Sequence, residues 1–252
     1  MGSINAEGAN NVAIIFGASR GFGDALAEAF LPTHSLFLSS RSGGGDKWQE
    51  RAQSSNKIHC GVLDVSASFD ELFDYCRAVT SNAVVQNADE VVVIFNAGCI
   101  SSHSYGADNV IHSNTISDDI SVNITGFCQL VSFMLSTLYD NNLKTKIRFI
   151  NVSSLLAVQP MQCFSLYCAG KAARDMYFRC LAEENGRSSS NSKFEDIKFL
   201  NYAPGPMPTD MVEGIKAKVA NAEVRKMFET LPLVACDRSA KILRHILRED
   251  SW

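Results

Sequence analysis

The chain has 252 residues, of which 46% are hydrophobic, 20% charged and 9% aromatic, with 16 Gly and 6 Pro. This composition is typical of a globular protein and excludes collagen-like, coiled-coil and largely disordered classes. The 23 Lys and Arg against 27 Asp and Glu give a net charge of −4, which leaves no basic surplus for sequence-independent binding to nucleic acid or to an anionic membrane.

The first expected element is a strand at residues 11–16, and similar aliphatic or β-branched runs follow at 35–39, 57–63, 91–95, 147–152 and 197–202. The runs are continuous rather than alternating in polarity, which is typical of strands covered on both faces. Helical patterns lie between them at 23–31, 68–78, 118–139 and 166–184. This alternation predicts a single α/β domain over residues 1–252, with a doubly wound parallel sheet of the Rossmann kind.

Two segments interrupt the alternation. Residues 186–193 (GRSSSNSK) are polar and rich in serine, which predicts a surface loop. Residues 203–210 carry three prolines that forbid a regular helix or central strand, and two charged helical stretches and a last helix near 239–248 follow. Because ligands of such sheets bind beyond the carboxyl ends of the strands, we expect residues 203–230 to cover the ligand crevice.

The cysteines and the first residues bear on metal binding and location. The eight cysteines are scattered, with no C-x-x-C pair and no Cys/His cluster at zinc spacing, so we expect no metal site. Residues 1–10 are polar and are expected to be flexible, without the layout of a signal peptide. No apolar run approaches the length of a membrane span, and we expect a cytoplasmic protein with reduced thiols.

A glycine-rich turn follows the first predicted strand and precedes a helix; it reads Gly17, Ala18, Ser19, Arg20, Gly21, Phe22, Gly23. A strand, turn and helix in this order direct backbone N–H groups and a helix N-terminus toward an anion, and the glycines allow a phosphate to approach closely. The G-x-x-x-G-x-G spacing differs from G-x-G-x-x-G, so the context more than the motif predicts a dinucleotide site.

The residues after the second strand discriminate between the two nicotinamide dinucleotides. An acidic residue there bonds a ribose 2′-hydroxyl, whereas a basic residue pairs with a 2′-phosphate. The chain has Arg41 at this point, no Asp or Glu in residues 39–42, and a second guanidinium, Arg20, inside the glycine turn. An arginine that only faces solvent is the alternative, but bidentate binding of phosphate by the two arginines favours NADP(H).

The fifth strand leads into Ser154, and Tyr167 and Lys171 follow at a helical spacing of four. The tyrosine and lysine therefore share one helix face, and the strand-end serine can point toward the same space. A neighbouring ammonium lowers the pKa of a phenol, so Tyr167 can protonate a carbonyl oxygen that Ser154 holds. An amphipathic helix with an exposed lysine is the alternative, and the upstream serine and glycine turn disfavour it.

The GASRGFG turn, Asn96-Ala97-Gly98, Ser154 and Tyr167-x-x-x-Lys171 together resemble the short-chain dehydrogenase/reductase family over nearly the whole chain. Through this resemblance Asn123, in the helix after the fourth strand, matches the family's fourth catalytic residue. Residue type alone would not single out Asn123. The family also implies a homodimer or homotetramer that pairs the helices of Asn123 and Tyr167.

Two longer runs, residues 151–176 and 201–211, resemble a branch of this family that reduces side-chain carbonyls of reduced pterins with NADPH, ending in tetrahydrobiopterin. This resemblance implies substrate contacts at Ser154, Leu155, Tyr167 and Gly205. Beyond the glycine turn and Asn96, Ala97 and Gly98, it implies cofactor contacts at Arg41, Ser42, Asp64, Val65, Tyr167, Lys171, Pro204, Gly205, Met207, Pro208, Thr209, Asp210, Met211 and Val212.

The sequence departs from this branch at its end. The branch has a tail beyond the last helix with an aspartate that anchors the pterin ring, and this sequence ends at Trp252 before such a residue. The expected cost of one lost charge-assisted contact is about 1.5 to 3 kcal/mol of pterin binding. A reductase of another ketone or diketone therefore stays open, as does a non-catalytic NADP-binding protein, which the four filled catalytic positions disfavour.

Overall fold

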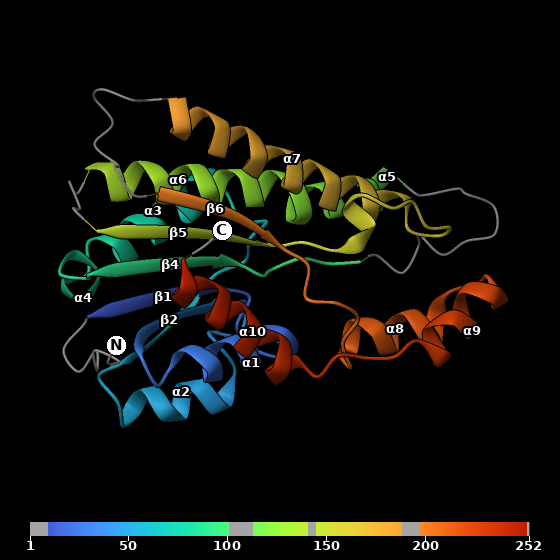
Figure 1. Cartoon of the computed structure of the whole chain (residues 1–252), viewed down its shortest axis with the longest axis horizontal. Helices are drawn as coiled ribbons and strands as arrows, with labels where there is room; N and C mark the ends of the chain where they lie inside the picture. Colours follow the sequence, from blue (N-terminus) through green and yellow to red (C-terminus); the bar gives the residue numbers. More distant parts are fainter. Residues whose placement is uncertain (1–9, 101–112, 141–144, 188–196, 251) are drawn as a thin grey trace.

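The computed structural model describes residues 10–100, 113–140, 145–187, 197–250 and 252 (Figure 1). Six strands of this part form one parallel sheet in the order β3-β2-β1-β4-β5-β6. This order confirms the doubly wound α/β fold expected from the sequence. The strands are β1 Asn11–Phe16, β2 His34–Ser40, β3 Ile58–Val62, β4 Glu90–Phe95, β5 Lys146–Val152 and β6 Ile197–Tyr202.

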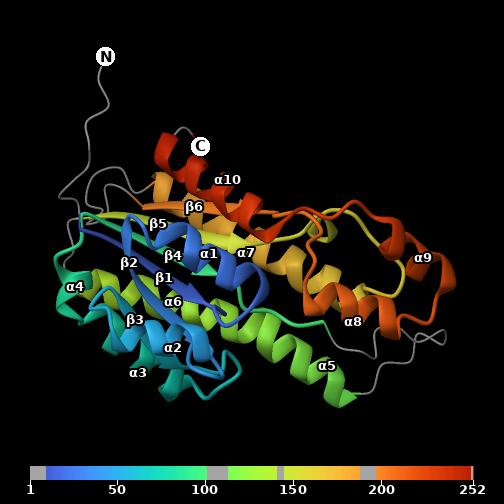
Figure 2. The same cartoon turned by 90° about the horizontal axis from the view of Figure 1, so that it is seen from below.

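Helices cover both faces of the sheet (Figures 1 and 2). One face carries α1 Gly21–Phe30, α2 Asp46–Gln53 and α10 Cys236–Glu249, and the other carries α3 Phe69–Thr80, α6 Gly126–Asp140 and α7 Ser165–Arg187. The remaining helical elements are α4 Ala83–Gln86, α5 Ser113–Ile120, a π-helical turn η2 Ser121–Thr125, a short 3₁₀ turn η3 Leu155–Ala157, α8 Asp210–Lys218 and α9 Ala222–Thr230.

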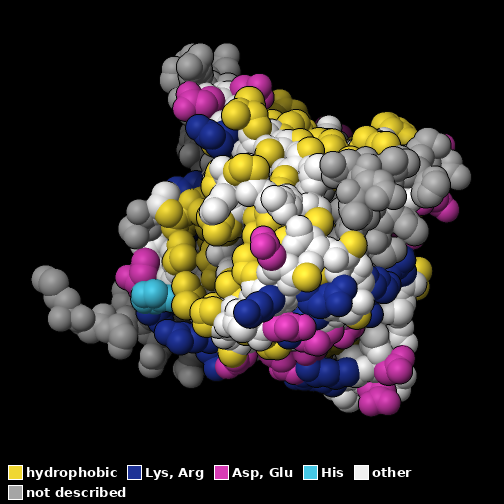
Figure 3. All heavy atoms as spheres, turned by 90° about the vertical axis from the view of Figure 1, so that its right-hand side faces the viewer, with side chains coloured by type: hydrophobic (Ala, Val, Ile, Leu, Met, Phe, Trp, Pro, Cys, Tyr) yellow, Lys and Arg dark blue, Asp and Glu magenta, His cyan; other side chains and the backbone are white. Residues whose placement is uncertain are grey.

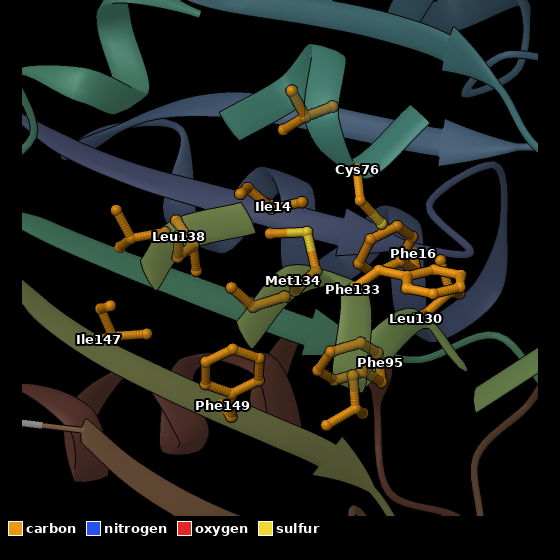
Figure 4. Packing of buried hydrophobic residues seen from close by; sticks show 14 of the residues in the cluster. Ile14, Phe16, Cys76, Phe95, Leu130, Phe133, Met134, Leu138, Ile147 and Phe149 are labelled. Carbon is orange, nitrogen blue, oxygen red and sulfur yellow. The ribbon is translucent and has the colours of Figure 1, made fainter. Parts of the chain in front are cut away.

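The strands contribute alternate side chains to two separate hydrophobic cores. In β1, Val12, Ile14 and Phe16 join the core under α3, α6 and α7, while Ala13 and Ile15 join the core under α1 and α10. Figure 4 shows the first of these cores, where aromatic rings from β1, β4, β5 and α6 meet. Burial on both faces explains why the strand sequences are continuously apolar.

Residues Thr115–Asp140 form a helical segment that is apolar and long enough to cross a membrane, by length and composition alone. The expectation that no apolar run reaches this length is therefore wrong. The reason is the core: Phe127, Leu130, Met134 and Leu138 of this segment are fully or almost fully buried against the sheet. The core helix of a globular protein passes the same test, so this segment is weak evidence for a membrane span.

The two segments that interrupt the alternation have different structures. The helix α7 continues to Arg187, so the first two residues of the loop expected at 186–193 belong to it, and 188–193 lie outside the described residues. The chain after the prolines forms α8 and α9 at the end of the sheet where the strands finish (Figure 1).

Candidate active site

The residues singled out by the sequence gather at the carboxyl ends of the strands, the end that Figure 3 shows face on. On this face hydrophobic and basic side chains lie next to one another. In doubly wound sheets this edge is where ligands bind.

The glycine turn between β1 and α1 is closely packed around its backbone. Gly17 and Gly21 have positive φ angles of 91° and 58°, a conformation that favours glycine. A Cβ at Gly17 would lie 2.8 Å from the backbone nitrogen of Ala97, and one at Gly23 would collide with the carbonyl oxygen of Gly17. Arg20, the N-cap of α1, makes no side-chain cap hydrogen bond, so the turn presents backbone N–H groups of the helix start.

The other turn residues and the Asn96 to Gly98 segment hold this geometry. Ala18 and Phe22 are buried, and the carbonyl of Ser19 lies 3.2 Å from where a Cβ of Gly45 would be. Asn96 Nδ2 donates to the carbonyl of Gly17 at 2.7 Å, and the backbone nitrogen of Ala97 donates to Phe16 at 2.8 Å. These contacts tie the end of β4 to the glycine turn.

The segment after β6 reaches the glycine turn. Arg20 pairs with Asp210 at 3.0 Å, and a Cβ at Gly21 would lie 3.3 Å from Thr209 Cγ2. Gly205 has a φ of 84°, and the carbonyl of Pro204 accepts a hydrogen bond from Ser239. Met207 packs against the core under α1, Met211 is exposed, and Val212 is buried with Leu156 and Phe164.

The residues after β2 and β3 lie close enough to interact. Arg41 and Ser42 are exposed after β2, as the NADP(H) hypothesis requires. Ser66 donates two hydrogen bonds to Asp64 Oδ1, from its backbone nitrogen and its hydroxyl, and these hold the pKa of Asp64 below its ordinary value, with a smaller contribution from Arg41. Val65 packs against the core beside α6.

Ser154, Tyr167 and Lys171 are brought together. Ser154 lies close enough to the Tyr167 phenol for its hydroxyl to lower the pKa of that phenol, and Lys171 Nζ lies 5.7 Å from the centre of the Tyr167 ring. Lys171 is buried and donates to the carbonyl of Val152, at the end of β5, at 2.6 Å. Leu155, which follows Ser154, is 62% exposed at the surface of the site.

Asn123 lies in the π-helical turn η2 and is buried at the same edge. Its side chain exchanges two hydrogen bonds of 3.0 Å with the backbone of Cys99, which follows Asn96-Ala97-Gly98. A Cβ at Gly98 would lie 3.2 Å from Asn123 Oδ1 and 3.9 Å from Lys171 Nζ. The four expected catalytic residues therefore surround one space.

Burial opposes the expected activation of the tyrosine. It raises the pKa of Tyr167, while the Ser154 hydrogen bond and the charge of Arg174 lower it. Burial also lowers the pKa of the Lys171 ammonium well below its ordinary value, and Arg174 lowers it further. The charged group that lowers the Tyr167 pKa in this structure is Arg174, and a contribution from Lys171 stays a prediction.

Sequence reasoning missed Arg174 and Cys99. Arg174 follows Lys171 by three residues on the same helix face, a spacing that could have identified it. Cys99 donates its thiol to Asp119 Oδ1 at 3.4 Å, and burial raises the pKa of this thiol to about 12. Among the described residues no group of His, Cys, Asp or Glu is arranged to hold a metal ion.

Comparison with known proteins links this geometry to a family. A family model described as short chain dehydrogenase matches residues 11–220. Sepiapterin reductase from Meriones unguiculatus is 31% identical and covers 96% of this chain and 92% of its own, and that from Xenopus tropicalis is 31% identical, covering 95% and 92%. Benzil reductase ((S)-benzoin forming) from Bacillus cereus is 25% identical, covering 95% and 94%.

Solved structures share the fold at lower identity. The KRED1-Pglu enzyme superposes with a TM-score of 0.73 at 22% identity, covering 94% of each chain. A short chain dehydrogenase/reductase from Saccharomyces cerevisiae superposes with a TM-score of 0.75 at 21% identity, covering 95% of this chain and 90% of its own.

Proposed function

The chain belongs to the short chain dehydrogenase family, and from that premise we propose that it uses NADPH to reduce a side-chain carbonyl of a reduced pterin, as a sepiapterin reductase of tetrahydrobiopterin formation. The proposal is supported by sepiapterin reductases that are about 30% identical over more than nine tenths of the chain. The observation that carries the chemistry is the grouping of Ser154 and Lys171 around Tyr167: the serine hydroxyl is close enough to lower the pKa of the phenol, and Lys171 Nζ lies 5.7 Å from the ring centre.

The glycine turn fits a dinucleotide. Side chains at Gly17 or Gly23 would fill the space beside Ala97 and the turn's own carbonyl, so a bound phosphate can meet the backbone directly. Arg20 and the exposed Arg41 supply guanidinium groups for a 2′-phosphate, which supports NADPH over NADH. A bound reduced nicotinamide would supply the hydride for the carbonyl carbon.

The chain's own residues supply the proton and the orientation. The Ser154 hydroxyl holds the carbonyl oxygen, and Tyr167 donates its phenolic proton to that oxygen as negative charge develops there. Lys171, fixed on the carbonyl of Val152, lies beside the phenol and keeps its ring in place. Asn123 fixes the backbone at Cys99 that borders the same space.

A second candidate is reduction of an apolar diketone. The apolar side chains of Leu155 and Val158, next to Ser154, are 62% and 79% exposed, which is a suitable surface for aromatic rings. The benzil reductase relative is named for such a substrate. This reading keeps the same proton donor and changes only the bound ketone.

The test is NADPH consumption with sepiapterin and with benzil at equal concentration. Higher kcat/KM with sepiapterin supports the pterin reductase, and higher kcat/KM with benzil supports the second candidate. NADPH binding without consumption of either would contradict both and favour a non-catalytic NADP-binding protein.

We further propose that the chain forms a homodimer or homotetramer through α6 and α7. The side chain of Met176 on α7 is 54% exposed, and Ile124 in η2 and Leu135 on α6 are only partly buried. Light scattering on the purified protein tests this, and a monomer over the working concentration range would contradict it.

A further inference from the structure

One of the two arginines that are completely buried in the described part of the chain lies directly beneath the proposed site. The side chain of Arg174, on α7, is 0% exposed. It donates to Asn151 Oδ1 at 2.9 Å and to the carbonyls of Ala97 and Phe95 at 2.9 and 2.8 Å. Its guanidinium lies 4.0 Å from the centre of the Phe127 ring. Its hydrogen-bond partners are neutral oxygens, so a charge has been taken out of water without a directly bonded carboxylate.

These partners are the strand ends to which the reacting residues are attached. Phe95 and Ala97 lead to Cys99, which holds Asn123, and Asn151 precedes Val152, which holds Lys171. A Cβ at Gly98 would lie 3.6 Å from Arg174 Nη1 and 3.9 Å from Lys171 Nζ. The guanidinium and the amine therefore lie on the same side of the site.

The guanidinium is also a positive charge in this region at neutral pH. Burial lowers the pKa of Arg174 to about 10, so it stays charged at neutral pH, while burial lowers the pKa of Lys171 well below its ordinary value. Among the described residues, the other titratable groups around Tyr167 and Lys171 are Cys168 and Asp175 on α7, Cys99 after β4 and Asp119 on α5.

We propose that Arg174 is a positioning residue of the reductase reaction: its guanidinium fixes the ends of β4 and β5 beneath Asn123 and Lys171 and, at neutral pH, provides a positive charge close enough to act on the Tyr167 phenol. The proposal rests on the proposed function for its role in turnover, but the state of the phenol can be measured without turnover. Asn151 completes the arrangement, because it accepts from Arg174 and donates to Asp175 Oδ1 at 3.0 Å.

The direct test is an ultraviolet titration of the Tyr167 phenol. The signal is the difference between each protein and its Tyr167→Phe counterpart, measured in the wild-type background and in Arg174→Met. We expect the Tyr167 midpoint to move to higher pH in Arg174→Met, because the phenolate loses the stabilising effect of a nearby cation. An unchanged midpoint overturns the proposal.

The matched control is Arg148→Met. Arg148 is equally buried but pairs with Asp250 at 3.2 Å, at the C-terminal end of α10. Its substitution should leave the Tyr167 midpoint unchanged, and a shift as large as that of Arg174→Met would overturn the proposal by showing a general effect of removing a buried charge.

Turnover provides the second measurement. With a carbonyl substrate that the wild type reduces, Arg174→Met should lower kcat by about tenfold, the effect of one pKa unit on a proton donor, with little change in the KM for NADPH. If Arg174→Met does not fold, Arg174→Lys decides: an amine cannot reproduce the three-way hydrogen bonding of the guanidinium, so kcat should fall. Wild-type kcat in Arg174→Lys would overturn the positioning role.

Failure of the proposed function gives a different result. A wild-type protein that consumes no NADPH with either ketone contradicts the function, yet the titration still answers whether Arg174 acts on Tyr167.

Discussion

Burial and nearby polar groups shift the pKa of the Tyr167 phenol in opposite directions. Burial raises its pKa, while the hydrogen bond from Ser154 and the charge of Arg174 lower it. A phenol that keeps its proton near neutrality is in the correct state to act as an acid in carbonyl reduction. In the proposed reaction the serine hydroxyl acts on both the substrate oxygen and the proton donor.

Removing the phenolic oxygen should abolish most turnover without loss of cofactor binding. Tyr167→Phe is expected to lower kcat by about 10² to 10⁴, the usual contribution of a general acid, while NADPH affinity measured by fluorescence stays within error. Tyr177→Phe, on the same helix but facing Phe127, should have wild-type kcat. Unaltered turnover in Tyr167→Phe would remove this residue from the mechanism.

The exposed Arg41 should determine the preference for the phosphorylated dinucleotide. Arg41→Ala is expected to weaken NADPH binding by about 1.5 to 3 kcal/mol, or roughly ten- to a hundredfold, and to leave NADH binding almost unchanged. Isothermal titration with both dinucleotides measures the ratio. Arg238→Ala, an exposed arginine of α10, is the control; an equal loss for NADH and NADPH would contradict the assignment.

The sequence identifies some of these residues better than others. Ser154, Tyr167 and Lys171 stand out because a strand end and a helical spacing of four restrict where their side chains can meet. Arg174 does not stand out, because arginines on helices mostly face solvent, and its burial depends on carbonyls of β4 and an amide of β5 that are distant in sequence. Residue type gives no indication of such long-range partners.

At the scale of the elements, the β1–α1 connection has no room for side chains at its glycines. Gly23→Ala would place a methyl group against the carbonyl of Gly17 and beside Asn96 Nδ2 at 2.8 Å. We expect a loss of about 1 to 3 kcal/mol in the free energy of unfolding and a marked fall in NADPH affinity, since the backbone must shift. Urea unfolding and dinucleotide titration measure the two effects.

Gly214, in α8, is the matched control for this substitution. A Cβ there meets nothing within 4 Å, so Gly214→Ala should leave NADPH binding unchanged and raise the free energy of unfolding by about 0.4 to 1 kcal/mol. Equal effects of the two substitutions would contradict the steric explanation.

The strands were predictable to within one or two residues, whereas some helices were not. Strand sequences are distinctive because both faces are buried, as in β4, Glu90–Phe95. The helix α2 was missed because Trp48 is the one buried residue in a polar run, DKWQERAQ. The π-helical turn around Asn123 could not be predicted from local propensity. Asn123 bonds the backbone of Cys99, which is 24 residues away in the sequence, and residue type does not reveal such a contact.

At the scale of the whole molecule, the sheet separates two hydrophobic cores. A histidine buried at the end of the sheet opposite the candidate site makes the free energy of unfolding depend on pH. His34, at the start of β2, is 7% exposed, and its Nε2 is buried without a hydrogen-bond partner in the described structure. Burial lowers its pKa from 6.5 to about 4. The nearest carboxylate, of Glu90, lies 3.9 Å away.

This histidine should destabilise the fold in mild acid. The unfolded chain binds a proton below about pH 6.5, whereas the folded chain resists it until about pH 4, so the free energy of unfolding falls as the pH falls between these values. The full loss is about 3 kcal/mol, and none is expected above pH 6.5. Urea unfolding from pH 7 to pH 4 should show a shallower decline in His34→Gln than in the wild type.

The exposed His245 of α10 gives the comparison. His245→Gln should follow the wild-type decline, because the side chain of His245 is 63% exposed to water and is not part of the buried region around His34. Parallel curves for His34→Gln and the wild type would rule out His34 as the source.

The ion pair between Arg20 and Asp210 joins residues far apart in the chain, and most of the other residues of the site, among them Asn123, Ser154, Tyr167 and Lys171, lie between them in sequence. A dinucleotide held there would connect segments that unfolding must separate, so occupancy adds to the stability of the entire fold: at a concentration one hundred times Kd the gain is about 2.7 kcal/mol. The supply of cofactor would then govern how long each molecule survives cellular proteolysis, as well as how fast it works.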